Sequence, residues 1–246
     1  MTNNLRSFAM GKPSALTLLL ALASYFSPCA AERPPYDVKL QPGAECEVAV
    51  NLLHPTQFAI GFREVHIRAG KIAQMKPSKL KKYLEERIVP LAISPHGAPY
   101  ILDHHHFVAA IIESGIRKTV PAKIMSNAAE ASEDEFWKLM RERQWVHPYD
   151  EKGNGPVSVT LLPASVTGLK DDPLRSLAWA VREEGGYERH DEIAYADFKW
   201  ANFFRQHITF EDTDAGFSAA IQNALHLAKT PAAKNLPGYK ATEIRP

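Results

Sequence analysis

The sequence predicts an α+β fold, in which a mixed sheet with its covering helices is followed by a mostly helical region. Two observations lead to this prediction. Short β-branched runs alternate with helix-like apolar periodicities as far as about residue 150, whereas from about residue 157 onward the apolar periodicity is helical. The apolar content of 45% and the charged content of 23% are ordinary for a globular protein.

Residues 1–31 have the three parts of a secretory signal peptide. Arg6 and Lys12 form a basic beginning, residues 15–25 are an uninterrupted apolar stretch, and small residues lead up to Ala31. The apolar stretch is too short to cross a bilayer as a helix. We therefore expect cleavage near Ala31, a periplasmic or secreted product, and no transmembrane span in the mature protein.

Removal of this segment changes the charge and the cysteine content. Its only charged residues are Arg6 and Lys12, so the formal net charge falls from +1 to −1. A nearly neutral protein lacks the overall positive field that gathers nucleic acid. Cys29 is lost as well, which leaves only Cys46 and excludes an intramolecular disulfide.

The first part of the mature chain is predicted to form one compact α/β unit over residues 48–150, after an extended, proline-rich lead-in at residues 32–47. Ser132 precedes acidic residues and an apolar pattern, which is typical of a helix start. The predicted strands are 48–53, 58–67, 89–93, 99–102 and 122–125, and the predicted helices are 79–87, the segment that ends at Gly115 and the segment that Ser132 begins.

The segment Asp150–Pro156 is the clearest boundary in the chain, because it combines glycine, proline and polar residues. Beyond it we predict a helical region at residues 157–246, with helices at about 173–184, 195–207 and 215–228. The apolar faces of these helices are too extensive to stay in water, so the region is expected to pack against the first unit.

A strand, a polar turn and a helix follow one another between Pro99 and Gly115. The turn consists of Asp103 and three histidines, and Asp103 is a good N-cap residue. The first N–H groups of a helix have no intrahelical acceptor and the helix dipole is positive there, so this turn is predicted to bind an anion such as phosphate. In the alternative interpretation, Asp103 only caps the helix and the histidines are surface or core residues.

Six short motifs, distributed over most of the chain after residue 31, point to a family. Together they resemble the ParB/sulfiredoxin fold superfamily and, within it, the ParB-like nuclease subgroup. The motifs are Pro55–Gln57, Gly61–Val65, Leu102–His106, Phe136–Trp137, Trp145–Asp150 and Asp171–Ala178.

The resemblance implies that the turn from Asp103 to His106 holds nucleotide or phosphate groups. Sulfiredoxin has a cysteine in this turn, whereas this chain has only Asp and His there, so thiol-dependent repair is not expected. Partitioning proteins usually carry an arginine at the position of Phe107. Arg63, Lys71 or neighbouring lysines would then have to supply the positive charge. Partitioning proteins also carry a helix-turn-helix domain and act in the cytoplasm, which does not fit an exported chain.

Two functions agree with these features. The first is an exported enzyme that hydrolyses phosphodiesters or nucleotides, in which a carboxylate positions a water or a metal ion and histidines act as acid–base groups or ligands. Magnesium or manganese is a candidate cofactor, and a nucleotide or nucleic acid is a candidate partner. The alternative is a non-catalytic module that binds a nucleotide, another anion or a protein. The predicted catalytic residues are Glu64, Asp103, His104 and His105, and the predicted phosphate-binding residues are Arg63, Lys71 and His106.

Overall fold

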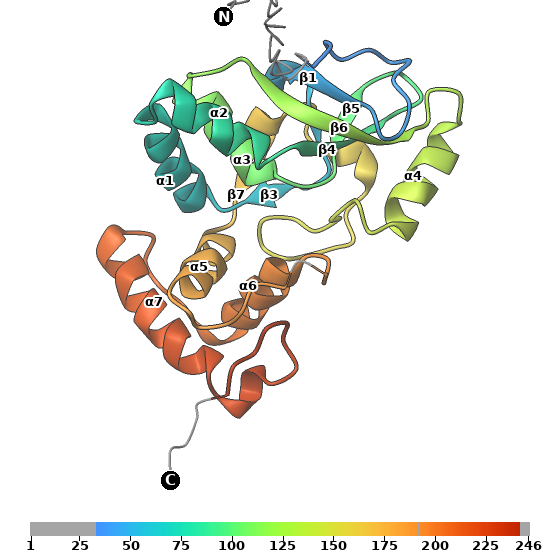
Figure 1. Cartoon of the computed structure of the whole chain (residues 1–246). Helices are drawn as coiled ribbons and strands as arrows, with labels where there is room; N and C mark the ends of the chain where they lie inside the picture. The colour runs from blue at the N-terminus through green and yellow to red at the C-terminus, as the bar shows by residue number, and fades with distance from the viewer. Residues whose placement is uncertain (1–32, 191, 242–246) are drawn as a thin grey trace, which may run out of the picture. The chain divides into compact units, whose positions relative to one another are not determined.

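A five-stranded mixed sheet lies between helices in the first half of the molecule (Figure 1). Strand β6 pairs antiparallel with β1 and parallel with β4, while β5 pairs antiparallel with β4 and parallel with β2. The strand order is β1-β6-β4-β5-β2, with bounds Glu45–Ala49 for β1, Thr119–Asn127 for β6, Val89–Ile93 for β4, Pro99–Ile101 for β5 and His54–Pro55 for β2.

The computed structural model describes residues 33–190 and 192–241. The predicted signal peptide at residues 1–31, with its cleavage point, lies outside the described residues. The described part has the predicted α+β fold. Within it, no helix has both the length and the apolar character that crossing a membrane requires.

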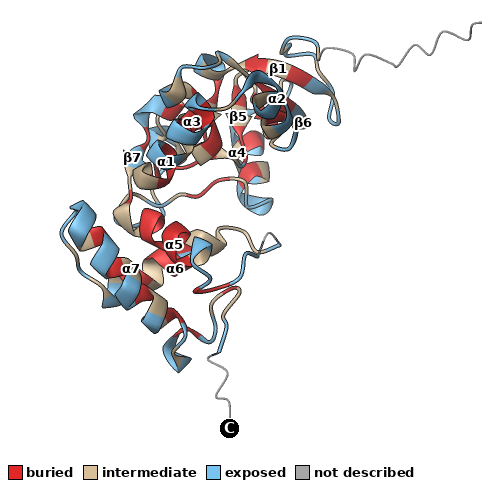
Figure 2. Cartoon of the chain, turned by 60° about the vertical axis from the view of Figure 1, so that its left-hand side comes forward, coloured by how far each residue is buried: buried red, intermediate tan, exposed pale blue. Residues whose placement is uncertain are grey.

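Four helices accompany the sheet: α1 (Phe62–Ala73), α2 (Pro77–Glu85), α3 (His105–Ser114) and α4 (Glu133–Glu142). The buried positions of α1, α2 and α3 form one core with the sheet, whereas those of α4 belong to a second cluster with Ala92 and Leu102 (Figure 2). Fully burying one such aliphatic side chain contributes about 1.5–3 kcal/mol. Two of the predicted helix ends are confirmed in atomic detail. Ser132 and Glu135 form a capping box at the start of α4, and Gly115 ends α3 with a φ of 62°.

The predicted strand at 58–67 is wrong beyond Ile60. Strand β3 is only Ala59–Ile60, and Glu64 lies in the first turn of α1 instead of on a strand. Val65, Ala69 and Ile72 are buried at helical spacing, and this periodicity outweighs the short alternating pattern that predicted a strand.

A second, two-stranded sheet connects distant parts of the chain. Strand β3 pairs in parallel with β7 (Lys170–Asp171), with Ala59 opposite Lys170. Immediately after β3, Gly61 lies so close to α5 (Pro173–Glu183) that an added Cβ would be 2.5 Å from Ser176 Oγ and 2.7 Å from the Ser176 backbone nitrogen. Only glycine permits this approach.

The helical region has a core of its own. Helix α5, α6 (Ala196–His207) and α7 (Asp214–Ala228) pack together through residues such as Leu177, Trp200 and Phe204. Asp172 caps α5 by accepting from the Leu174 and Arg175 N–H groups. Helix α5 also contacts α1. The structure does not test the predicted boundaries at 48–150 and 157–246, which therefore stay predictions.

Candidate functional site

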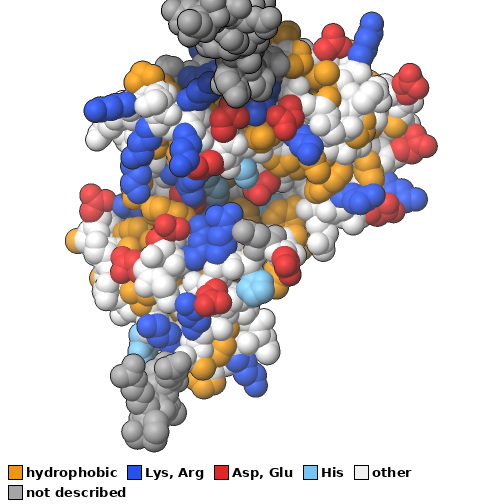
Figure 3. Space-filling model, in the orientation of Figure 1, with side chains coloured by type: hydrophobic (Ala, Val, Ile, Leu, Met, Phe, Trp, Pro, Cys, Tyr) orange, Lys and Arg blue, Asp and Glu red, His pale blue; other side chains and the backbone are white. Residues whose placement is uncertain are grey.

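A polar cavity of about 840 Å³ lies at the beginning of helix α3. It is lined by residues of α1, α3 and α5 and by the segment that leads into α6, so residues from both halves of the chain form its walls. In the space-filling view, charged and histidine side chains gather at the centre of the face shown (Figure 3). The cavity is therefore suited to a polar ligand.

Glu64 is buried beneath this cavity and is held by two arginines. Its Oε1 accepts from Arg68 Nε at 2.8 Å and from Arg68 Nη2 at 2.7 Å, and its Oε2 lies 3.3 Å from Arg175 Nη1. The side chain of Glu64 is 3% exposed. Both carboxylate oxygens are thus engaged within the protein.

Asp197 is the second buried carboxylate of the site. It pairs with Arg175 Nη2 at 3.0 Å and with Arg182 Nη1, and it accepts from the Tyr187 hydroxyl at 3.0 Å. Burial opposes ionisation of Asp197, but the ion pairs with Arg175 and Arg182 outweigh it and hold the carboxyl pKa below its usual value. Asp197 is therefore a carboxylate near neutral pH.

The linked cluster of Glu64, Arg68, Arg175, Arg182 and Asp197 carries an excess of positive charge. Three guanidinium groups face two carboxylates, which gives a formal charge of +1. Arg182 also reaches the exposed Glu183 at the rim, at 3.4 Å. Glu183 balances the formal charge, but its side chain is 57% exposed and is screened by water. Because charges interact more strongly away from water, the buried guanidinium groups favour an anion in the cavity.

His106 is neutral in this environment. Its Nε2 accepts from the Gly61 N–H at 2.9 Å, so its proton is on Nδ1. Burial and the neighbouring Arg175 lower the pKa of His106 well below the usual value. The 3.5 Å approach of His106 Nε2 to Glu64 Oε2 is therefore a contact between two acceptors and not an ion pair.

His105 is neutral for the same reason. The Thr56 N–H donates to its Nε2 at 3.1 Å, and burial lowers the pKa of His105 to about 3. The proton is thus on Nδ1, which has no hydrogen-bond partner among the described residues. His104 precedes it with a left-handed φ of 70°, and burial also lowers the pKa of His104.

The prediction that Asp103 caps helix α3 is wrong. The N-cap position is occupied by His104, and no side chain caps this helix. Among the described residues, the exposed carboxylate of Asp103 accepts only from the adjacent His104 N–H, at 2.6 Å, because the left-handed turn at His104 directs the chain away from the geometry of an N-cap.

The beginning of α3 consequently keeps its unpaired amide groups. None of the described residues accepts a hydrogen bond from the N–H groups of His105, His106 and Phe107. Beside them, the buried Nε of Arg175 also has no partner within the described part of the chain. Unpaired amides at a helix start, next to an excess of guanidinium groups, are suited to binding phosphate.

The structure brings together five of the predicted site residues and separates two others. Glu64 and the turn from Asp103 to His106 line the cavity. Arg63 does not, because its guanidinium pairs with Asp212 at 2.9 Å and with Asp214, the first residue of α7, at 2.7 Å. Lys71 is exposed on α1 and is also absent from the cavity wall.

The basic residues that do line the cavity were not assigned to it from the sequence. Arg68 comes from α1, one helical turn after Glu64, whereas Arg175 and Arg182 lie seven residues apart on the otherwise apolar, buried face of α5. Two arginines on an apolar face are a recognisable signal of buried ion pairs. Arg175 pairs with Glu64 and Asp197, whereas the nearby Asp172 binds Arg205, at 2.7 Å.

A metal site made only of side chains is not formed in the part of the chain that the structure describes. There, no group of three or more His, Cys, Asp or Glu residues is arranged to hold a metal ion. The effect of magnesium and manganese therefore has to be measured, by assaying the protein with and without each ion.

Comparison with known proteins identifies the family of this chain. Residues 46–206 match the model of the family described as "Putative ParB-like nuclease". The chain belongs to the ParB-like nuclease family. It is also similar to a solved structure, the protein Atu1540 from Agrobacterium tumefaciens, with 33% sequence identity and a TM-score of 0.72 over 81% of this chain and 99% of that protein. The comparison with curated proteins gives no match.

Family membership confirms the resemblance found in the sequence motifs. The matched range includes Glu64, the turn from Asp103 to His106, Arg175 and Asp197, so the whole candidate site lies within the ParB-like nuclease domain. The family description indicates a nuclease-like function and hence a nucleic acid as a potential partner.

Proposed function

We propose that this protein hydrolyses phosphodiesters or nucleotides, with a phosphate group held at the beginning of helix α3. The observation that supports this most directly is the open helix start beside the Arg68–Arg175–Arg182 cluster. The amides of His105, His106 and Phe107 offer three donors, and the buried guanidinium groups beside them supply positive charge away from water.

Asp103 is the residue that we assign to the reacting water. Its carboxylate is exposed and lines the cavity, and within the described part of the chain its one hydrogen-bond partner is the adjacent His104 N–H, which leaves lone pairs for a water or a metal ion. His104 and His105 contribute as neutral hydrogen-bond donors or acceptors, because their lowered pKa values keep them uncharged near pH 7.

Glu64 acts as a positioning residue in this proposal. Both of its oxygens already accept from Arg68 or Arg175, so it is poorly placed to remove a proton from water. Its contribution is to keep these two guanidinium groups in place beneath the phosphate site. His106 has a similar role, because its Nε2 is used by the Gly61 amide.

The test is a hydrolysis assay of the purified full-length protein on DNA, RNA and nucleoside triphosphates, with and without magnesium or manganese. We expect turnover with at least one of these substrates, and a loss of about 100-fold or more in kcat for Asp103→Asn. The matched control is Asp134→Asn, which removes an exposed carboxylate from the first turn of α4, outside the cavity. Equal activity of the two variants would remove Asp103 from the mechanism.

A non-catalytic binding module is the second candidate function. It is favoured by the complete use of Glu64 in ion pairs, which leaves Asp103 as the only one of the two proposed carboxylates free to act. Absence of turnover with every substrate, together with thermal stabilisation by phosphate or a nucleotide, would support this alternative over the enzyme.

We also propose that the protein acts after export. The basic, apolar and small-residue parts of residues 1–31 support this proposal. N-terminal sequencing of the natively expressed protein is expected to begin near Glu32. An intact Met1 in the cytoplasmic fraction would contradict export.

A further inference from the structure

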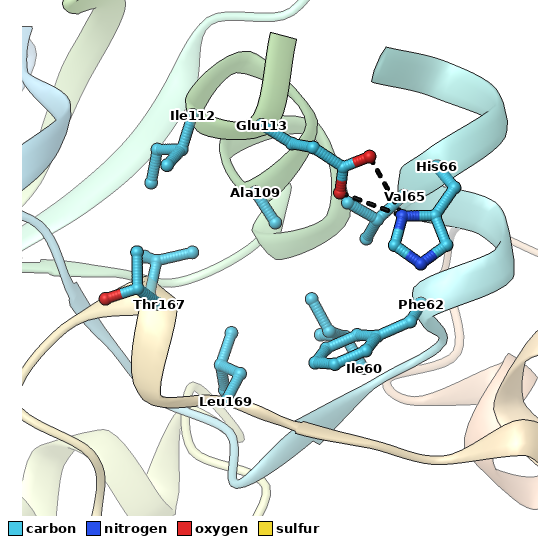
Figure 4. A pocket seen from close by; sticks show the side chains of 10 residues that line it. Ile60, Phe62, Val65, His66, Ala109, Ile112, Glu113, Thr167 and Leu169 are labelled. Atoms are coloured by element: carbon cyan, nitrogen blue, oxygen red, sulfur yellow. Dashed lines mark hydrogen bonds and ion pairs between the residues drawn. The ribbon is translucent and has the colours of Figure 1, made fainter. Parts of the chain in front are cut away.

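A second cavity, of about 220 Å³, lies on the other side of the α1–α3 helix pair and takes no part in the proposed reaction (Figure 4). The close-up shows apolar side chains from α1, α3 and the segment before β7 surrounding the space. The wall is formed mainly by Ile60, Phe62, Ala109, Ile112, Val166 and Leu169.

One polar pair stands at the edge of this cavity. Both carboxylate oxygens of Glu113 lie 2.9 Å from His66 Nδ1. Because a carboxylate accepts, Nδ1 must donate, and the remaining lone pairs of Glu113 stay available. The Glu113 side chain is 40% exposed and can therefore be approached by a ligand.

We propose that this cavity binds a small aromatic molecule that carries a single N–H or O–H donor, of the size of phenol or indole. An apolar cavity of about 150 Å³ in another protein accommodates benzene, so a space of about 220 Å³ is large enough for one or two fused rings. The apolar wall contacts the rings, and the Glu113 carboxylate accepts from the donor group.

The position of the Glu113–His66 pair makes the cavity selective for one kind of ligand. Apart from Glu113, His66 and Thr167, the residues that line the space are apolar, so the Glu113 carboxylate favours a donor group and repels a ligand carboxylate. An apolar molecule without a donor gains only the wall contacts. We therefore expect indole to bind at least about fivefold more tightly than naphthalene, and benzoate to bind more weakly than phenol.

The first experiment uses the unaltered full-length protein. Titration calorimetry with indole, naphthalene, phenol and benzoate measures the four affinities, and intermolecular NOEs locate bound indole. We expect contacts from indole protons to the methyl groups of Ala109, Val166 and Leu169. NOEs only to residues outside this cavity would overturn the proposal, and equal affinities for indole and naphthalene would overturn the role of Glu113.

The second experiment uses substitutions. Ala109→Leu fills the cavity and is expected to abolish indole binding, whereas Ala73→Leu, at an exposed position near the end of α1, should leave it unchanged. Glu113→Gln should reduce the preference for indole over naphthalene. Unchanged indole binding by a folded Ala109→Leu variant would contradict the site. If the parent protein does not bind indole and the Ala109→Leu variant has an altered sedimentation coefficient, the proposal is wrong. The cavity then belongs to a contact with a second copy of the chain.

Discussion

Helices α1 and α3 begin in opposite ways, although they lie side by side. At the start of α1, the N–H groups of Gly61, Phe62 and Arg63 donate to His106, Asp171 and Ser176, at 2.9, 2.7 and 3.2 Å. At the start of α3, the N–H of the N-cap residue His104 donates to Asp103, but no described residue accepts from the N–H groups of His105, His106 and Phe107. One helix start is thus satisfied by the protein, and the other is open to a ligand.

The difference between the two helix starts shows how a fold can leave backbone amides available to bind an anion. Unsatisfied amides at a buried helix start are costly, so a protein normally supplies acceptors from its own side chains, as it does for α1. The open start of α3 is tolerated because it faces a polar cavity of about 840 Å³. A helix start that adjoins both guanidinium groups and solvent can exchange water for phosphate.

A substitution at the start of α1, where the amides are paired, is expected to have the largest effect on stability. Gly61→Ala would place a Cβ 2.5–2.9 Å from Oγ, N and Cα of Ser176, and N and Cα are backbone atoms that cannot rotate away. We expect a loss of about 3 kcal/mol in the free energy of unfolding, measured by urea denaturation.

The matched control is Gly70→Ala in the same helix. An added Cβ at Gly70 meets no atom within 4 Å, and alanine is the better helix former, so this variant should be more stable by about 0.5–1 kcal/mol. Similar effects of the two substitutions would show that the Gly61–Ser176 contact is not a constraint.

Lowering the pH is expected to have the next largest effect, because the open start of α3 holds a neutral histidine. The pKa of His105 is about 3 in the folded protein, against about 6.5 when unfolded. Above about pH 6.5 this residue is neutral in both states. As the pH falls from about 6.5 toward 3, the unfolded chain binds the proton first, so stability is lost.

The expected loss between pH 7 and pH 5 is about 2 kcal/mol from His105 alone. Burial also lowers the pKa of His147, to about 4, which adds to the same trend. Urea denaturation at the two pH values checks this. The variant His105→Gln, whose amide oxygen can still accept from the Thr56 N–H, should show a smaller loss. An identical loss in the variant would assign the effect to other groups.

The smallest expected effect comes from Asp103, the residue expected to cap α3. A true N-cap contributes about 1 kcal/mol, whereas an exposed side chain without such bonds contributes less than about 0.5 kcal/mol. We expect Asp103→Ala to change the unfolding free energy by less than about 0.5 kcal/mol, as measured by thermal denaturation.

The comparison variant is Asp172→Ala, which removes a real N-cap. Asp172 is buried and accepts from two amides of α5 and from Arg205, so its loss should cost at least about 2 kcal/mol. If Asp103→Ala proves as destabilising as Asp172→Ala, the start of α3 is capped after all in solution.

The sequence predicted local structure well where neighbouring residues determine it. Ser132 before its acidic residues and Gly115 after an apolar helix face both act within one helical turn, and both predictions are confirmed. Glu64 was misplaced on a strand because the segment after Gly61 offers both a short alternation and a helical periodicity. Packing of Val65 and Ile72 in the core favours the helix. Their core partners lie far away in the sequence, so a short stretch of sequence around Glu64 does not show this packing.

The site was also predictable only where neighbouring residues determine it. The turn from Asp103 to His106 is a local pattern, and the structure places it on a cavity with Glu64. Arg68 is a local partner of Glu64, one helical turn away, but Arg175 is not local, because it joins residues 64 and 197 across the two halves of the chain. Arg63 looked available for phosphate only because its partners Asp212 and Asp214 lie about 150 positions later in the chain.

The acceptors that complete helix α1 also determine when the site can form. Asp171 and Ser176 follow the amides that they bind by 109 and 113 residues, so these bonds require closure of a very long loop. Such non-local contacts form late in folding. A nascent chain that ends before Asp171 therefore lacks these caps and the arginine bridge, and we expect phosphate binding to appear only when the chain is nearly complete.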